Sequence, residues 1–306
     1  RMIYTVTLNP SIDYIVHVTD FQPGTVNRMT KDFKFPGGKG INVSRILKRL
    51  DASSTVLGFL GGFTGTFIKE ALQKEGLDCD FTEIGDDTRI NIKLKSATET
   101  EINGGGPEIT NQEIQLLKQQ LSNVQKGDIV ILSGSAPSSL RKGFYQELIA
   151  IVKEKDADFV IDTTGQDLAD ALSSEPLLVK PNNHELADLY DTTFNSIADI
   201  IPYGKRLLAD GARHVIISMA GDGALLFTDA GVYQSNVLKR PLKNSVGAGD
   251  SMIAGFIGAY EKTSDPLTAF KMGVACGSGT AFSDDLATRE MIDSLLDEVI
   301  VTKISE

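Results

Sequence analysis

The sequence contains few of the residues that build disulfide frameworks or metal clusters. Its 306 residues include two cysteines, Cys79 and Cys276, and three histidines, and neither set has the spacing of metal ligands. We therefore expect no disulfide framework and no histidine-based metal site. The sequence also shows no secretory signal pattern and no apolar run long enough to span a bilayer. These absences predict a cytoplasmic protein.

Two common nucleotide-binding motifs are also missing. The segment Gly37-Gly38-Lys39-Gly40 has neither the spacing of a Walker A loop nor a hydroxyl residue after the lysine, and no G-x-G-x-x-G pattern occurs. Any phosphate binding must therefore use other loops. The formal net charge of −11 argues against an extended nucleic-acid surface, although it leaves room for a local basic pocket.

The spacing of apolar residues predicts one α/β domain. Strands alternate with amphipathic helices from residue 111 to residue 218, which is typical of βαβ units and of a parallel sheet covered on both faces. Two earlier segments, 13–35 and 89–103, have the alternation of a small antiparallel β appendage. Other expected strands are 3–8, 54–60, 128–133, 158–161, 177–179, 214–218, 224–228 and 232–235, and expected helices are 40–50, 66–74, 111–122, 142–153, 167–172, 196–209, 249–261, 266–282 and 289–299.

The segment Asn244-Ser245-Val246-Gly247-Ala248-Gly249-Asp250 is the most informative part of the chain. It reads as a glycine loop that leads into a helix, and a helix N-terminus with free N–H groups suits an anion. Asp250 at this point can accept a proton from an attacking hydroxyl while the N–H groups hold a transferring phosphoryl group. The alternative is that Asp250 only caps the helix.

Three further segments have the composition of ligand loops. Segment 36–42 is a glycine loop at the start of a helix, in which Lys39 offers a positive charge and Asn42 lies on the first turn. Segment 180–185 follows a strand, and Asn182 and Glu185 can either hold Mg²⁺ through water or cap a helix. Segment 218–223 is a glycine turn whose N–H groups can meet a nucleotide phosphate or only connect two strands.

Together these segments resemble the PfkB (ribokinase-like) family of sugar kinases, and the similarity runs nearly end to end. Three family motifs occur in family order: Gly37 to Asn42, Asn182 to Glu185, and Asn244 to Ser251 followed by Ala254-Gly255. The resemblance implies a ribokinase-like three-layer α/β domain over residues 2–306, with a mostly parallel central sheet. It also implies a small β-sheet lid formed by insertions at about 11–36 and 88–105.

The resemblance assigns roles to individual positions of this chain. Asp250 matches the catalytic base, and Gly247, Ala248 and Gly249 match the anion hole for the γ-phosphate of ATP. Asp13, Gly38 and Asn42 match residues that hold sugar hydroxyls, and Lys39 and Arg89 match basic residues near the substrate phosphate, with Arg28 as a further candidate. The residues that match the nucleotide and Mg²⁺ side are Lys180, Asn182, Glu185, Ser218, Gly221 and Gly223, with Asn182 and Glu185 reaching Mg²⁺ through water.

Within the family, Lys39 and the N-terminal segment 8–13 resemble the branch that phosphorylates hexose phosphates. This implies ATP-dependent phosphorylation of fructose 1-phosphate at C6, which Ala248 and the segment 281–288 favour over tagatose 6-phosphate as substrate. The alternatives are tagatose 6-phosphate phosphorylated at C1, fructose 6-phosphate, or a non-catalytic sugar-phosphate sensor. A sensor needs no base, so the presence of Asp250 argues against it. The lid strands imply a homodimer, with a monomer as the alternative.

Overall fold

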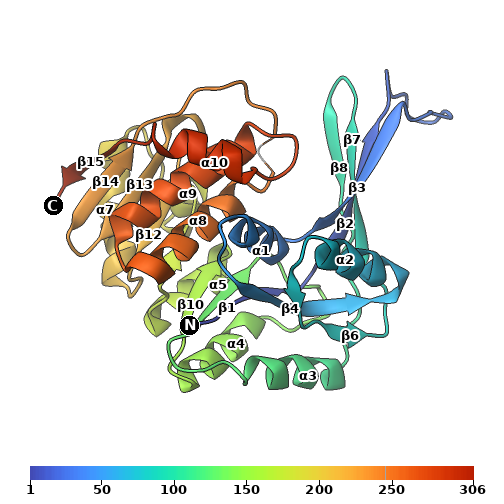
Figure 1. Ribbon diagram of the computed structural model, residues 1–306, viewed down its shortest axis with the longest axis horizontal. Helices are drawn as coiled ribbons and strands as arrows, with labels where there is room; N and C mark the ends of the chain where they lie inside the picture. Colours follow the sequence, from blue (N-terminus) through green and yellow to red (C-terminus); the bar gives the residue numbers. More distant parts are fainter. Residues whose placement is uncertain (245) are drawn as a thin grey trace.

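The computed structural model describes residues 1–244 and 246–306, so Ser245, a member of the expected anion-binding loop, lies outside the described residues. The described residues form two β-sheets with helices packed around the larger one (Figure 1). The larger sheet has eleven strands in the order β15-β14-β13-β12-β11-β10-β9-β1-β4-β5, with β6 also paired to β4. The smaller sheet has the order β3-β2-β7-β8, and we call it the lid sheet.

The central sheet is parallel from β5 to β12 and antiparallel over its last three pairings. This matches a chain in which helices connect most strands, because parallel neighbours require a crossover. Its strands are β1 (Ile3–Thr7), β4 (Ser54–Gly61), β5 (Asp78–Cys79), β6 (Thr82–Ile84), β9 (Ile129–Ser133), β10 (Asp158–Asp162), β11 (Leu178–Val179), β12 (Val215–Ser218), β13 (Ala224–Thr228), β14 (Gly231–Ser235) and β15 (Val301–Ser305).

Helices cover both faces of the central sheet. Helices α3 to α7 pack on one face, and α1, α8, α9 and α10 pack on the other, while α2 lies beside β4 near the lid sheet. The helices are α1 (Lys39–Arg49), α2 (Gly62–Lys74), α3 (Asn111–Leu121), α4 (Phe144–Glu154), α5 (Gly165–Ala171), α6 (Asn183–Leu189), α7 (Ile197–Ala209), α8 (Ala248–Thr263), α9 (Pro266–Ala281) and α10 (Arg289–Leu296), with short 3₁₀ turns η1 (Leu172–Ser174) and η2 (Ala220–Asp222).

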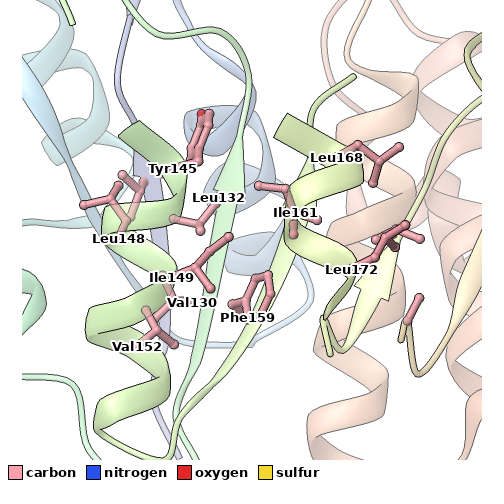
Figure 2. Packing of buried hydrophobic residues seen from close by; sticks show 14 of the residues in the cluster. Val130, Leu132, Tyr145, Leu148, Ile149, Val152, Phe159, Ile161, Leu168 and Leu172 are labelled. Atoms are coloured by element: carbon pink, nitrogen blue, oxygen red, sulfur yellow. The ribbon is translucent and has the colours of Figure 1, made fainter. Parts of the chain in front are cut away.

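Alternation along the strands divides the core into two layers. Val130 and Leu132 of β9 face α4, where Leu148 and Val152 meet them (Figure 2). Ile131, between them in the sequence, faces the opposite layer. Successive side chains of a strand point to opposite faces, so an uninterrupted apolar strand is buried on both sides.

The lid sheet consists of β2 (Ser11–His17), β3 (Lys31–Gly37), β7 (Arg89–Lys95) and β8 (Glu99–Ile102). β2 pairs antiparallel with β3 and parallel with β7, and β7 pairs antiparallel with β8. The sheet is therefore assembled from two segments far apart in sequence, and it projects from the central sheet (Figure 1). We call the place where these segments join the main body the lid root.

The predicted three-layer architecture with a mostly parallel sheet and a small separate β-sheet is confirmed. Helix α2 begins at Gly62, earlier than the predicted 66, and α10 ends at Leu296 rather than 299. Strands β5, β6 and β15 were not predicted, and helix α6 was expected only in the alternative in which Asn182 and Glu185 cap a helix. Most of these elements are very short, and β15 is an exposed edge strand with little hydrophobic alternation. No helix in the described part of the chain is long and apolar enough to cross a membrane.

Candidate active site

A cavity of about 460 Å³ opens between the central sheet and the lid sheet. It lies at the carboxyl ends of β1 and β9, where ligands of open α/β sheets collect. Most of its lining side chains are polar, which suits a hydroxyl-rich ligand. The lining residues are Thr7, Asn9, Ser11, Asp13, Gly38, Lys39, Asn42, Arg89, Asn91, Lys93, Glu101, Asn103, Ser133, Gly134, Ser135, Val246, Gly247, Gly249 and Asp250.

Asp250 lies on the first turn of α8 with its carboxylate at the cavity, and only 4% of the residue is exposed. Its Oδ2 accepts a hydrogen bond from Nδ2 of Asn42 at 3.0 Å, whereas its Oδ1 has no hydrogen-bond partner among residues 1–244 and 246–306. Burial raises the pKa of this carboxyl, the ammonium of Lys39 opposes that rise, and the charge of Asp162 adds to it. A buried carboxylate with a raised pKa and a free oxygen is suited to accept a proton.

The loop before Asp250 leaves the start of α8 open. The N-cap residue is Gly247, in the left-handed conformation with φ 84°, and no side chain in the described part of the chain caps the helix. The N–H groups of the first turn are therefore not occupied by a capping side chain and can receive an anion. The alternative interpretation of Asp250 as the helix cap is wrong, because Asp250 lies inside the helix and its carboxylate contacts Asn42.

Helix α1 brings Lys39 and Asn42 to the same cavity. Its N-cap Gly38 has φ 135°, and a Cβ there would lie 2.6 Å from Cγ2 of Thr7 on β1. Only glycine permits this close approach. The Nζ atom of Lys39 lies 3.7 Å from Oδ1 of Asp250 and 3.7 Å from Oδ2 of Asp162. These carboxylates, Asp162 more than Asp250, raise the pKa of Lys39, so that it carries a positive charge beside the base.

Arg45, farther along α1, fixes this helix against the C-terminal part of the chain. Its buried guanidinium forms two ion pairs, with Glu75 at 2.8 Å and with Asp285 at 2.6 Å. Leu286, the next residue, packs so closely on Gly247 that a Cβ on that glycine would lie 2.8 Å from its Cδ2. The segment that contains Asp285 and Leu286 thus contacts both helix α1, which carries Lys39, and the loop at the start of α8.

The lid sheet contributes Asp13 and Arg89 to the cavity. Ser11 donates a hydrogen bond to Asp13 at 2.7 Å, and burial raises the pKa of the Asp13 carboxyl. Arg89 donates from Nε and Nη2 to the carbonyl oxygen of Asn9, at 3.2 and 2.9 Å, and from Nη1 to that of Gly104 at 3.0 Å. Arg89 therefore links the segment just before β2 to the segment just after β8 at the lid root.

Arg28 is not brought to the cavity of its own chain. It lies in the exposed loop between β2 and β3, at the far end of the lid sheet. Gly38, Lys39, Asn42, Asp13 and Arg89 do line the cavity, as the sequence predicts for one connected site.

The predicted nucleotide-side residues follow β11 and β12 and lie beyond the cavity lining. Lys180 packs beside α8, since a Cβ on Gly249 would lie 3.0 Å from its Nζ. Asn182 and Glu185 form a capping box at the start of α6, with hydrogen bonds of 2.9 and 2.7 Å. Asn182 also pairs with Ser218 in an isolated parallel bridge, which places both segments side by side. Gly221 lies in η2 with open space around it, and Gly223 follows with φ 88°.

Sequence reasoning missed several polar residues of the site. Asp162 ends β10, and Ser133 and Ser135 lie at and just after the end of β9. The buried Oδ2 of Asp162 and Oγ of Ser133 have no hydrogen-bond partner in the part of the chain that the structure describes. Their position at the carboxyl ends of predicted strands was an available signal. Asn91 and Lys93 of β7 were also missed, although they alternate with Arg89 and so must share its face of the lid sheet.

Comparison with known proteins identifies the family. Residues 6–288 match the model of the pfkB family carbohydrate kinases. The chain is 52% identical to a 1-phosphofructokinase of Bacillus subtilis, over 99% of this chain and 100% of the relative. It is 37% identical to a D-tagatose-1-phosphate kinase of Bacillus licheniformis, again over 99% and 100%.

A solved structure shares the whole architecture. The crystal structure of phosphofructokinase-2 from Escherichia coli in complex with substrates and products superposes with a TM-score of 0.93 at 26% identity, covering 97% of this chain and 99% of that one. The ribokinase-like fold expected from the sequence is therefore present. The chain belongs to the pfkB family of carbohydrate kinases, and it is a phosphotransferase with an alcohol group as acceptor.

Proposed function

We propose that this protein uses ATP to phosphorylate fructose 1-phosphate at C6, producing fructose 1,6-bisphosphate. The observation that carries this proposal is the buried Oδ1 of Asp250, which has no hydrogen-bond partner within the described residues and lies in the same cavity as the start of α8, where no described side chain acts as a cap. A base for a hydroxyl and an anion site are the two elements that phosphoryl transfer to an alcohol needs. The choice of sugar is supported by the 52% identical relative named 1-phosphofructokinase.

In the proposed mechanism Asp250 accepts the proton of the C6 hydroxyl as its oxygen attacks the γ-phosphate. Asn42 holds Oδ2 of the carboxylate, so that Oδ1 remains available for this proton. The N–H groups around Gly247, Ala248 and Gly249 receive the negative oxygens of the phosphoryl group. The resemblance matches Lys39 to a residue near the substrate's own phosphate, but its Nζ lies 3.7 Å from Asp250, so we propose instead that it adds positive charge where negative charge develops. Asp13, Gly38 and Asn42 hold the sugar hydroxyls.

The nucleotide is proposed to lie along the segments that contain Lys180, Ser218, Gly221 and Gly223. Lys180 beside Gly249 supports this, because it places a cation next to the phosphate end of that path. The exposed turn at Gly221 leaves room for a bulky group. Arg89 and Arg28 are proposed as contacts of the substrate's own phosphate, Arg89 from the lid root and Arg28 only if the lid loop approaches a site.

The oxygen donors near the cavity fit Mg²⁺. Glu185 and Asn182 are proposed to reach the ion through water, and Oδ2 of Asp162 is a buried carboxylate oxygen with no hydrogen-bond partner from any described residue. Among the described residues no cluster of three histidine, cysteine or acidic side chains could hold a metal alone. This agrees with an ion that keeps waters and binds nucleotide phosphates. When bound, Mg²⁺ supplies neutralisation of phosphate charge.

D-Tagatose 1-phosphate, phosphorylated at C6, is a second candidate, because the 37% identical relative is named for that sugar phosphate. Tagatose 6-phosphate and fructose 6-phosphate are the further alternatives. Steady-state assays with all four sugar phosphates test the proposal, with the phosphorylated carbon identified by ³¹P NMR. We expect the highest kcat/KM with fructose 1-phosphate. Failure to phosphorylate it at C6 would refute the assignment, and no turnover of any of the four would favour a sensor.

We also propose that residues 2–306 act as one domain in the cytoplasm and that the lid, built from about 11–36 and 88–105, forms a homodimer. The lid face opposite the cavity carries apolar residues, of which Ile90 is 42% and Ile102 57% exposed. A small sheet with exposed apolar residues and open edges gains stability by pairing. Light scattering at micromolar concentration should give twice the 33.0 kDa chain mass, and a value near 33.0 kDa would exclude the dimer.

A further inference from the structure

Three basic side chains line the cavity, and two of them are already engaged. Lys39 lies between the carboxylates of Asp162 and Asp250, at 3.7 Å from each. Arg89 uses three of its five N–H donors on the carbonyl oxygens of Asn9 and Gly104. Lys93 is the third, and within the described residues it forms no ion pair. Among the described residues, Arg89 and Lys93 thus both lack an ion pair, and Lys93 differs from Arg89 in that its ammonium makes no hydrogen bond there either.

The strand pairing in the lid sheet indicates where the ammonium group of Lys93 lies. Two lysine–glutamate pairs lie directly opposite each other on β7 and β8: Lys95 with Glu99 and Lys93 with Glu101. The outer pair closes as an ion pair of 2.8 Å, but the inner pair does not, although both members line the cavity. The ammonium of Lys93 also acts on Asp13, whose pKa it lowers more than Arg89 does, against the rise that burial causes. Lys93 thus faces the cavity near Asp13.

The chemistry of the proposed substrate requires a cation in this part of the cavity. The reacting hydroxyl must lie within hydrogen-bond reach of Asp250. A phosphate on the other end of the six-carbon chain then lies away from Asp250, and so away from Lys39. Lys93 lines the cavity from the lid sheet, on a different element from Lys39 and Asp250.

We propose that Lys93 binds the phosphate that the sugar substrate already carries and thereby selects phosphorylated over unphosphorylated sugars. This rests on the proposed sugar-phosphate kinase function. Asn91 and Asn103, which line the same part of the cavity, supply neutral hydrogen-bond donors to the same phosphate. Because the charge of Lys93 is unpaired before binding, the phosphate gains a charge-assisted contact without having to displace a carboxylate.

The test compares Lys93→Met with wild type on fructose 1-phosphate and on fructose, which lacks the resident phosphate. We expect kcat/KM for fructose 1-phosphate to fall about 10- to 100-fold, the usual effect of losing a charge-assisted contact. The value for fructose should stay within about twofold, because the reacting end is untouched. Lys95→Met, on the same strand and face but paired with Glu99, is the matched control and should leave both values unchanged.

Equal losses on both sugars, or no loss on either, would overturn the role of Lys93. Lys93→Gln repeats the comparison with a neutral polar side chain should the methionine variant be poorly folded, and the same selectivity loss is expected. The wild-type enzyme separates this inference from the proposed function. If wild type prefers another hexose phosphate, the assignment of fructose 1-phosphate fails. The role of Lys93 is then tested by comparing kcat/KM of wild type and Lys93→Met on that sugar phosphate and on the same sugar without its phosphate. If wild type turns over none, titration calorimetry of fructose 1-phosphate against wild type and Lys93→Met decides it, and equal affinity would refute the inference.

Discussion

Asn42 donates a hydrogen bond from Nδ2 to Oδ2 of Asp250 at 3.0 Å, across 208 residues of sequence. One residue lies on the first turn of α1 and the other on the first turn of α8. The amide occupies one carboxylate oxygen and leaves the second for the substrate. A sugar hydroxyl bound near Asn42 is thus automatically close to the proposed base.

Asp250→Asn should remove the base while preserving shape. We expect kcat to fall by about 10²- to 10⁴-fold, the usual contribution of a positioned general base. Because the change is nearly isosteric, nucleotide affinity measured by calorimetry and the circular dichroism spectrum should remain those of wild type. Near-normal turnover by a folded variant would remove Asp250 from the proton transfer.

The pH dependence should reveal the charge environment of Asp250. The base acts when deprotonated, so kcat/KM should fall as the pH drops through its pKa, which burial raises above the ordinary 3.8. The charge of Asp162 contributes to this rise. Asp162→Asn should therefore move the acid limb of the profile to lower pH. Asp158→Asn, at the opposite end of β10, should not move it; a limb that stays in place in Asp162→Asn would contradict the assignment.

Lys39→Met should affect kcat more than KM for the sugar phosphate. The ammonium lies 3.7 Å from Asp250 and therefore acts at the reacting end of the substrate. We expect kcat to fall about 10²-fold, comparable to the loss of one donor to a developing oxyanion. Lys48→Met, an exposed position on the same helix, is the control. A rise in KM with unchanged kcat would instead place Lys39 at the resident phosphate.

His214 should make the fold sensitive to mild acid. Its Nδ1 lies 2.9 Å from the carbonyl oxygen of Leu177, and burial lowers its pKa from the ordinary 6.5. The unfolded chain then binds more protons than the folded one between the lowered value and about 6.5. The stability that the neutral, buried His214 contributes to the folded state is fully present above about pH 6.5, and it is lost as the pH falls through the pKa of His214 in the folded state.

Urea unfolding at pH 7.5 and 5.5 measures this effect. The free energy of unfolding should decrease less in His214→Gln than in wild type, because the titrating group is gone. His184→Gln, at an exposed position on α6, should behave like wild type. An unaltered pH dependence in His214→Gln would show that other groups cause the acid sensitivity.

The sequence predicted the elements whose signals are local. The strand–helix alternation gives the parallel sheet, and the glycine loops at Gly38 and Gly247 mark two helix starts at one cavity. The start of α2 was placed too late because its first turn contains Gly62 and Gly65, which have low helix propensity. Gly65 keeps this turn close to β4, since a Cβ would lie only 3.1 Å from the backbone of Leu60.

The site residues that sequence reasoning missed belong to no motif. Asp162 and Ser133 each end a strand of the sheet, and they become neighbours only through the pairing of β10 with β9. Lys93 reaches the cavity because β7 pairs with β2, which fixes the face that Arg89, Asn91 and Lys93 share. Such positions depend on strand register, which local composition does not determine.

The parallel pairing of β2 with β7 also limits which segments of this enzyme can be exchanged with those of a related protein by recombination. Seven residues of β2, from Ser11 to His17, are each matched to one of β7. A recombination point between residues 38 and 88 would join half of one parent's lid to half of the other's. It would combine Asp13 of one parent with Arg89 and Lys93 of the other. Changes of sugar preference should therefore arise by paired substitutions, one in β2 and one in β7. Functional chimeras should exchange both lid segments together.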